Sequence, residues 1–427
     1  MSLPQARRPR PTARLLLLAA TAASLVAGGC GGSAGAASPV LRIGAIFPLS
    51  GNAEEPATDE YAGAQIAVDL ANNAGGAQGR QIRLDLRDVE SAGAVQAAAD
   101  SLHGDGVAAV IGAYSSQLSI PAAAAVARDG MVYWETGAVA DQVTGQGSPL
   151  VFRVGADGAD LGGNAGRFVT SVLAPRLGRQ AATLSAYLVT ADDAYGQSVA
   201  AGSRTALSSG GVAIAGETRY DPFRPDWGPA LAAIAASHPD LLVLSSHIPD
   251  GIAFRRAFLA AHLHVAAFLG TTMAQCMSDF GDALGPDAVG VFASDRPEAG
   301  FNPAALSPPA RRLYDELATA WRARTGRAPT EEAVSGFTSA WVLVHEVLPG
   351  AARPDAGAIA AAARALDLPS GALPNGGGVR FAASGEQMGQ NQRAVAVVWQ
   401  WQAVRHSVVV WPPAYATGSV TMVPLPA

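Results

Sequence analysis

Lysine is entirely absent from this 427-residue sequence, and all 29 of its cationic side chains are arginines. That absence excludes Schiff-base chemistry and the phosphate-binding lysine of a Walker loop. Charged residues make up only 15% of the chain and hydrophobic residues 49%, so the sequence is not that of a disordered polyampholyte. What remains is a globular chain with enough residues for two or three domains.

Catalytic and metal-binding signatures are missing as well. No expected strand is followed by G-x-G-x-x-G, and neither H-E-x-x-H nor C-x-x-C occurs. His262 and His264 have no carboxylate beside them, and the default role of Asp192 and Asp193 is to form a turn. We therefore expect no enzyme activity, no cofactor and no metal site.

The N-terminal segment has the features of an export signal. Four arginines and no acidic residue precede the apolar run at residues 15–27, and Gly28-Gly29-Cys30 follows it. These 13 apolar residues are too few for a membrane span, which needs about 20. We predict a lipoprotein-type signal peptide at 1–29, lipidation of Cys30 and a flexible tether at 30–38. The alternative is an ordinary signal peptide with an incidental cysteine.

Removal of residues 1–29 takes away four positive charges and moves the net charge from −6 to −10. An acidic chain is a poor partner for nucleic acid, whose phosphates demand basic patches. It is also repelled by anionic lipid, so any membrane attachment should come from Cys30. We expect an exported protein anchored on the outer face of the cytoplasmic membrane, in the periplasm or at the cell surface. Lipidated Cys30 cannot pair with Cys276, the only other cysteine, so no intramolecular disulfide is expected.

Apolar runs and helical patterns alternate along the rest of the chain. This order predicts an α/β fold with two doubly wound, parallel-sheet lobes and a ligand site in the cleft between them. Strands are expected at 40–47, 82–86, 107–111, 131–134, 151–154, 182–190, 212–217, 241–245, 267–269 and 290–293. Helices are expected at 60–73, 95–102, 120–128, 160–173, 196–207, 227–237, 251–261, 309–325 and 334–348.

Two loops after expected strands are suited to holding a ligand. Ser115 and Ser116 stand just before a helix, where hydroxyl groups and the helix dipole attract a carboxylate. The alternative role of these serines is plain helix capping. The second loop is Thr136-Gly137-Ala138, whose small residues let backbone groups approach a ligand closely.

An ordered set of motifs over some 350 residues resembles the leucine/isoleucine/valine-type periplasmic binding proteins, the solute-binding components of ABC importers. The motifs include Pro48-Leu49-Ser50-Gly51, Tyr61-Ala62-Gly63-Ala64, Ala74-Gly75-Gly76, Val110-Ile111-Gly112, Phe152-Arg153, Asp193-Ala194-Tyr195-Gly196 and Gly378 with Phe381.

The resemblance implies the type I periplasmic-binding fold, in which two lobes are joined by a three-segment hinge and close on the ligand. Lobe 1 would be 39–153 plus 297–392, and lobe 2 would be 154–296 plus 393–427, with crossovers near 153–157, 294–298 and 392–397. The function implied is capture of a small polar solute by a monomer that delivers it to permease subunits. A ligand-sensing domain coupled to a membrane receptor or kinase is the alternative.

The same resemblance assigns site residues. Ser115 and Ser116 would grip a carboxylate, and Ala138, after Gly137, would supply a backbone contact. Tyr195 would act as the lid residue, with strand-to-helix packing as its alternative role. His247 would take the place of an aromatic ligand contact.

Three departures from the family pattern concern the ligand. Val139 and Thr272 stand where the family's amino-acid binders hold the α-ammonium, and neither carries a charge. Pro56 replaces an expected aromatic wall. An amino acid, an amide or a related organic acid remains possible, with Glu135 or Glu55 as an anion for a cationic ligand.

Overall fold

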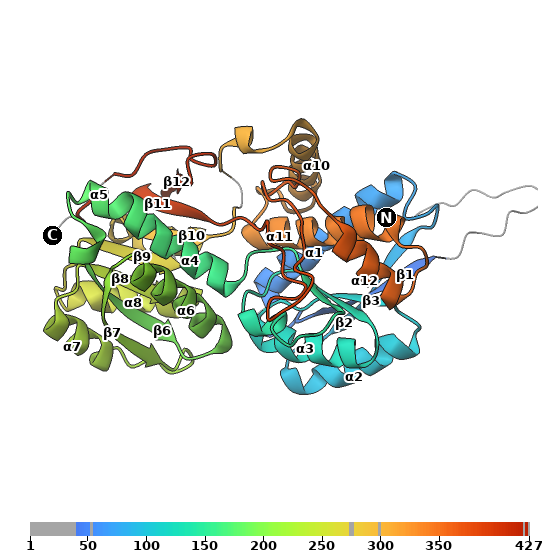
Figure 1. Cartoon of the computed structure of the whole chain (residues 1–427), viewed down its shortest axis with the longest axis horizontal. Helices are drawn as coiled ribbons and strands as arrows, with labels where there is room; N and C mark the ends of the chain where they lie inside the picture. Colours follow the sequence, from blue (N-terminus) through green and yellow to red (C-terminus); the bar gives the residue numbers. More distant parts are fainter. Residues whose placement is uncertain (1–39, 52–53, 273–276, 298–299, 422, 426–427) are drawn as a thin grey trace, which may run out of the picture. The chain divides into compact units, whose positions relative to one another are not determined.

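The computed structural model describes residues 40–425 except 52–53, 273–276, 298–299 and 422 (Figure 1). The predicted signal peptide and the whole tether with Cys30 lie outside the described residues, as does Cys276. Within the part that is described, no helix is both long and apolar enough to cross a bilayer.

The first sheet is five-stranded and entirely parallel, with the strand order β2-β1-β3-β4-β5. Two separate apolar clusters line its faces, which makes it doubly wound as predicted. Its strands are β1 (Leu41–Phe47), β2 (Ile82–Asp88), β3 (Ala109–Gly112), β4 (Val132–Glu135) and β5 (Val151–Arg153). Its helices are α1 (Glu54–Asn73), α2 (Ala92–Gly104), α3 (Ser116–Arg128), α10 (Pro308–Thr325), α11 (Glu331–Trp341) and α12 (Ala356–Ala365).

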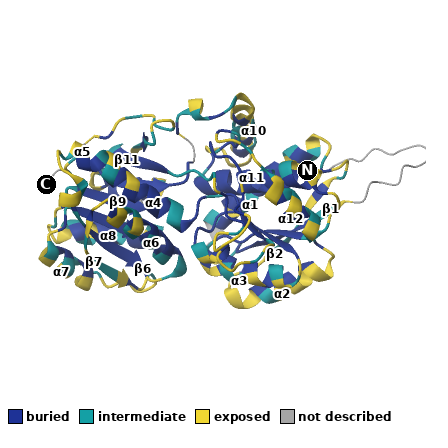
Figure 2. Cartoon of the chain, viewed as in Figure 1, coloured by how far each residue is buried: buried dark blue, intermediate teal, exposed yellow. Residues whose placement is uncertain are grey.

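The second sheet has seven strands in the order β12-β11-β10-β9-β8-β6-β7. Apolar clusters again line both faces, and the central strands of both sheets are buried beneath helices whose outer residues are exposed (Figure 2). The strands are β6 (Ser185–Ala191), β7 (Ala213–Tyr220), β8 (Leu241–Ser245), β9 (Ala267–Thr271), β10 (Phe292–Asp295), β11 (Val397–Ala403) and β12 (His406–Trp411). The helices are α4 (Gly158–Phe168), α5 (Ala174–Arg176), α6 (Ala194–Ser209), α7 (Gly228–Ser237), α8 (Ile248–Ala260) and α9 (Ser278–Leu284).

The second sheet is not parallel throughout. β11 pairs antiparallel with β10, and β12 pairs antiparallel with β11. Only Val404 and Arg405 separate β11 from β12. A two-residue connection can join antiparallel strands but is too short to join parallel ones. Arg405 takes the positive φ of 56° that such a tight turn requires. The parallel-sheet prediction therefore holds for β6–β10 and is wrong for this hairpin.

The helix α10 shows how the apolar pattern determines packing. Leu317 and Trp321 are spaced four residues apart and are both fully buried, whereas most of the rest of this helix is exposed. Ser307 caps its first turn by accepting the N–H of Ala310, and Gly326 ends it in the left-handed conformation. The predicted helix at 309–325 is thus confirmed.

Helices α1 and α11 approach each other through glycine. A Cβ on Gly63 would lie 2.2 Å from the carbonyl oxygen of Ala333, and one on Gly336 would lie 2.0 Å from that of Glu60. No other residue type fits at such a distance. The close crossing brings the middle of α1 against the first turns of α11, which matters for the site.

The chain passes between the two sheets by three connections. It leaves the first sheet after Arg153, leaves the second after Asp295, and returns to the second at Val397. Gln390, which lies shortly before the third connection, bonds to the first one, because its side chain accepts the Arg153 Nε–H at 2.7 Å and donates to the carbonyl of Gly155 at 2.9 Å. The residue boundaries predicted for the two lobes remain a prediction.

Candidate functional site

The predicted site residues all follow the carboxyl ends of parallel strands. In the first sheet, the serines come after β3 and the Gly137-Ala138 turn comes after β4. In the second, Tyr195, His247 and Thr272 come after β6, β8 and β9. Open α/β sheets bind ligands at this edge, because the strand ends and the helix N-termini converge there.

The two serines have different surroundings. Ser116 is the first residue of α3 and is buried, and its hydroxyl accepts the N–H of Ala140 at 3.1 Å. Ser115 precedes the helix with a φ of +76°, and its side chain makes no capping hydrogen bond. Plain helix capping therefore does not explain Ser115. A non-glycine residue at positive φ is uncommon and is often found at ligand sites.

The turn after β4 is held by a carboxylate from within the protein. Glu135 Oε1 accepts the N–H groups of Thr136, Gly137 and Ala138 at 2.9, 2.8 and 2.7 Å, and its Oε2 accepts the Tyr133 hydroxyl at 3.0 Å. Both carboxylate oxygens of Glu135 therefore already accept hydrogen bonds, and the residue is fully buried. It is not placed to pair with a cationic ligand. The Ala138 carbonyl accepts the Arg153 guanidinium at 3.2 Å. The predicted ligand contact by Ala138 would require one of these bonds to be exchanged.

The three predicted residues of the second sheet lie together. The Tyr195 hydroxyl is 2.7 Å from the Thr272 hydroxyl and donates to the Ser246 carbonyl at 3.1 Å. The rings of Tyr195 and His247 are 4.8 Å apart between centroids. Thr272 is buried and adopts a φ of +71°. The strand ends thus assemble a tyrosine, a histidine and a threonine into one polar group.

His247 is oriented by an aspartate. Its Nε2 lies 2.6 Å from Asp193 Oδ2, while Asp193 Oδ1 accepts the N–H of Gly196 and caps α6. Burial lowers the pKa of the His247 imidazole, but its hydrogen bond to Asp193 and the negative charge of that residue outweigh burial and raise the pKa. Asp193 is therefore both a helix cap and the partner of a histidine, and not only a turn residue.

The departures from the family pattern have a structural explanation in one case. Val139 is buried in an apolar cluster with Ala156, Leu161, Tyr195 and Val199. Val139 follows β4 of the first sheet and packs against α4 and α6, which cover the second sheet. An apolar contact between the two halves thus stands where the family pattern has a polar contact to the ligand. Pro56 lies half-buried in the first turn of α1, and the side chain of Glu55 lies outside the described residues.

Sequence reasoning missed a buried acidic group beside this site, which we call the α11 acidic cluster: Glu60, Glu331 and Glu332 around Arg296. Arg296 Nε lies 2.6 Å from Glu331 Oε1, and its Nη1 donates to the Gly137 carbonyl at 2.8 Å. Two consecutive glutamates after Thr330 are typical of a solvated helix start. The sequence alone therefore carried no signal that they are buried.

Burial raises the pKa of each carboxyl in the α11 acidic cluster. For Glu60, burial and then the charge of Glu135 hold the pKa well above its usual range. For Glu331, burial outweighs the lowering effect of Arg296, and for Glu332 burial is reinforced by the charge of Glu331. Three carboxyl groups thus lie around one guanidinium, with Glu60 fully buried and Glu331, Glu332 and Arg296 only slightly exposed.

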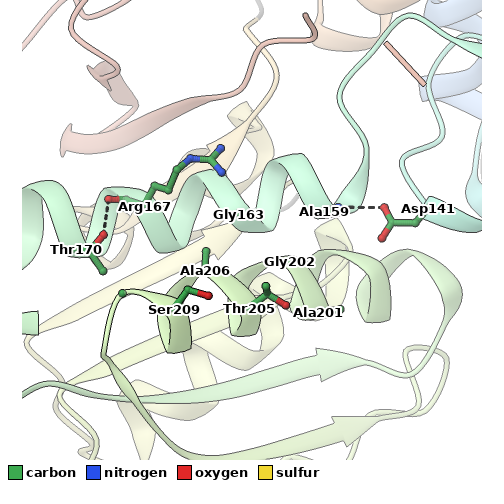
Figure 3. A pocket seen from close by; sticks show the side chains of 11 residues that line it. Asp141, Ala159, Gly163, Arg167, Thr170, Ala201, Gly202, Thr205, Ala206 and Ser209 are labelled. Carbon is green, nitrogen blue, oxygen red and sulfur yellow. Dashed lines mark hydrogen bonds between the residues drawn. The ribbon is translucent and has the colours of Figure 1, made fainter. Parts of the chain in front are cut away.

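A cavity also lies outside this group of residues (Figure 3). It has a volume of about 620 Å³ and lies between α4 and α6, lined mainly by glycine, alanine and small polar residues. Its charged residues are Arg167 and Asp141, and the Asp141 carboxylate already accepts the N–H of Ala159 at 3.0 Å. No predicted site residue lines it, and it follows a helix pair rather than strand ends. We therefore interpret this cavity as a groove along the α4–α6 helix pair, left because the side chains that line it are small. Within the described part of the chain, no three His, Cys, Asp or Glu side chains are arranged to hold a metal ion.

Comparison with known proteins identifies the family of this chain. A family model described as periplasmic binding protein matches residues 40–402. Leu/Ile/Val-binding protein homolog 8 of Brucella abortus is 27% identical over 366 residues, covering 85% of this chain and 88% of the relative. Leu/Ile/Val-binding protein homolog 7 of Brucella melitensis is 26% identical over 408 residues, covering 95% and 98%.

Solved structures share the fold. The branched-chain amino acid substrate-binding protein LivJ from Streptococcus pneumoniae, in complex with isoleucine, matches with a TM-score of 0.69 at 20% identity, covering 88% of this chain and 100% of LivJ. A solute-binding protein from R. palustris in complex with benzoate matches with a TM-score of 0.67 at 18% identity, covering 89% and 98%. This chain belongs to the periplasmic binding protein family, with the type I fold, and is a solute-binding protein rather than an enzyme.

Proposed function

We propose that this protein captures a small polar solute between its two sheets and delivers it to the permease subunits of an ABC importer. The observation that carries the proposal is the placement of polar side chains from both sheets at strand carboxyl ends. Ser115 and Ser116 would hold the carboxylate from the first sheet, with Gly137 and Ala138 beside them. Tyr195, His247 and Thr272 would close from the second sheet.

The relatives narrow the class of solute. Structural neighbours are in complex with isoleucine, leucine and benzoate, which have a carboxylate in common. Benzoate has no ammonium group. In this chain Val139 packs in an apolar cluster and the Thr272 hydroxyl meets Tyr195, so a second polar group of the ligand needs another partner. The proposed class is an amino acid, an amide or a related organic acid.

Closure of the two lobes would signal to the importer that a solute is bound. A solute that contacts both sheets binds the closed form better and shifts the population toward it, and the importer would recognise that form. Lobe 1 (39–153 plus 297–392) and lobe 2 (154–296 plus 393–427) would move as units about the three connections. The protein would act as a monomer on the outer face of the cytoplasmic membrane, tethered by lipid on Cys30.

A thermal-shift screen of amino acids, amides and small organic acids tests this function. A solute present at 100 times its dissociation constant adds about 2.7 kcal/mol to the free energy of unfolding. The Ser116→Ala variant should bind the best solute about 1–3 kcal/mol more weakly, because a hydrogen bond to an anionic group is lost. Ser208→Ala, an exposed serine on α6, is the matched control and should bind as the native protein does. A screen in which no compound raises the melting temperature would contradict the proposal.

A further inference from the structure

Asp193 contacts the region of the predicted lid twice, once through a backbone group and once through a side chain. Its Oδ1 accepts the N–H of Gly196 at 2.7 Å and so caps α6, the helix in which Tyr195 is the second residue. Its Oδ2 lies 2.6 Å from Nε2 of His247, the residue that precedes α8. One carboxylate thus fixes both the helix that bears Tyr195 and the imidazole ring beside it.

The His247 ring in turn supports the Tyr195 ring. The two ring centroids are 4.8 Å apart, and the ring planes are tilted by 34°. The Tyr195 hydroxyl donates to the carbonyl of Ser246, the neighbour of His247, at 3.1 Å, and it lies 2.7 Å from the Thr272 hydroxyl. The segment before α8 therefore holds Tyr195 both at its ring and at its hydroxyl.

The pair that holds Tyr195 reaches water, whereas Tyr195 itself is buried. The side chains of His247 and Asp193 are 36% and 31% exposed, and Tyr195 is 6% exposed. A change in the pH of the medium therefore reaches the imidazole while the site stays folded. Histidine is the side chain that ordinarily changes its charge between about pH 5 and pH 8.

Acidic groups approach the imidazole from several elements. Asp193 and Tyr195 belong to the start of α6, Asp250 lies in the first turn of α8, and Tyr220, at the end of β7, donates to Asp250 Oδ2 at 2.5 Å. Burial lowers the pKa of His247, but the hydrogen bond to Asp193 and the charges of Asp193 and Asp250 raise it overall. The surroundings thus favour the protonated ring, whose charge-assisted bond to Asp193 is stronger than the bond of a neutral ring.

Helix capping explains only part of this arrangement. An aspartate at the start of a helix is common and needs no further role. Capping uses Oδ1 alone, however, and does not account for the contact of Oδ2 with an imidazole from another helix. Asparagine caps a helix as well as aspartate does but carries no charge, so one substitution separates the two roles.

Resting on the proposed function, we propose that Asp193 is a positioning residue for the lid: it acts through His247, and the protonation of His247 determines how firmly Tyr195 is held over the bound solute. When the ring loses its proton, its bond to Asp193 weakens, Tyr195 is held less firmly and the closed form is less favoured. The site then retains its solute in mildly acidic medium and releases it faster as the pH rises.

Titration of the seven histidines by NMR tests the first step without any solute. The signal of His247 is identified by its absence from the spectrum of His247→Gln. In Asp193→Asn this ring should titrate at a lower pH than in the native protein, because its negative partner is gone. Asp355→Asn alters the cap of α12 in the same way and should leave the titration of His247 unchanged.

Stopped-flow dissociation of L-leucine and of benzoate, measured from pH 5 to pH 9, tests the second step. In the native protein and in Asp355→Asn, the off-rate of a probe that binds should rise about three- to tenfold across the titration of His247. In Asp193→Asn, which should still melt cooperatively because α6 stays capped, the off-rate should be near the native value at pH 9 throughout.

The outcomes separate this proposal from the proposed function. If a probe binds and its off-rate depends on pH equally in the native protein and in Asp193→Asn, the positioning role is wrong and solute capture stands. A His247 that titrates identically in these two proteins also overturns the positioning role alone. If neither probe binds, capture of these solutes is contradicted, and the positioning role falls with it.

Discussion

Removing the Glu135 carboxylate should destabilise the protein strongly without removing a ligand contact. In Glu135→Ala, the N–H groups of Thr136, Gly137 and Ala138 lose the oxygen that accepts all three at 2.7–2.9 Å. Glu135 is fully buried, so water does not readily replace it. The turn that presents Ala138 to the site would lose its anchor.

The magnitude follows from the three donors. Each buried N–H left without a partner costs about 1–3 kcal/mol, which gives a gross loss of about 3–9 kcal/mol. Two effects reduce it. Burial raises the pKa of Glu135, so part of the cost of holding this carboxyl is recovered when it is removed, and water can enter the space left behind. We expect a net loss on the order of 3 kcal/mol.

Urea unfolding followed by tryptophan fluorescence measures this loss. Glu135→Gln keeps an amide oxygen for the three N–H groups and should cost only about 1 kcal/mol. Glu316→Ala, at an exposed position of α10, should remain within about 0.5 kcal/mol of the native protein. A Glu135→Ala variant as stable as the native protein would refute the anchoring role, above all if it had lost solute binding.

Three further results are expected. Burial holds the pKa of Glu331 and Glu332 above the ordinary 4.5, so the folded state binds more protons than the unfolded state, and the contribution of these groups to stability is lost as the pH rises from about 5 to about 8. In thermal melts, the melting temperature of Glu332→Gln should equal that of the native protein at pH 5 and exceed it at pH 8. Equal dependence of the melting temperature on pH in the two proteins would exclude a buried proton on Glu332. Tyr195→Ala removes the hydroxyl that meets Thr272 and should mainly speed solute dissociation in stopped flow; an unaltered off-rate would contradict its role as the lid. Trp134→Ala leaves a cavity beside Phe152 and Phe381 and should cost about 3–5 kcal/mol in urea unfolding; a loss below about 1 kcal/mol would show that this aromatic cluster is not central to the core.

The fold was predictable because strands that are buried on both faces consist of short apolar runs, and turn residues separate these runs in the sequence. The run at 241–245 coincides with β8, Leu241–Ser245. Helix starts were less certain. The predicted start at 120 lies one turn inside α3, which begins at Ser116, because polar residues in a first turn resemble a loop.

Some features depend on contacts far apart in the sequence. β11 pairs antiparallel with β10, although the segment between them, which contains α10, α11 and α12, packs on the first sheet. No local sequence pattern indicates a pairing over so long a separation. α12 (Ala356–Ala365) is made up largely of alanine, and the sequence analysis did not predict it.

The candidate site was predictable only in part. The resemblance to the family assigned Tyr195, His247 and Thr272, and the structure places these three side chains close together, whereas their part in solute binding stays a prediction. The α11 acidic cluster was not found, since its burial follows from the glycine-mediated crossing of α1 and α11. Glu135 was suggested as a partner for a cationic ligand, and the structure instead uses both of its oxygens within the protein.

Small-angle X-ray scattering of the purified protein, alone and saturated with the solute that most raises its melting temperature, tests the central claim most directly. If the two sheets close on the solute, the radius of gyration should fall on saturation, and Tyr195→Ala should need more solute to show the same change. Superimposable profiles at saturating solute would contradict capture by closure.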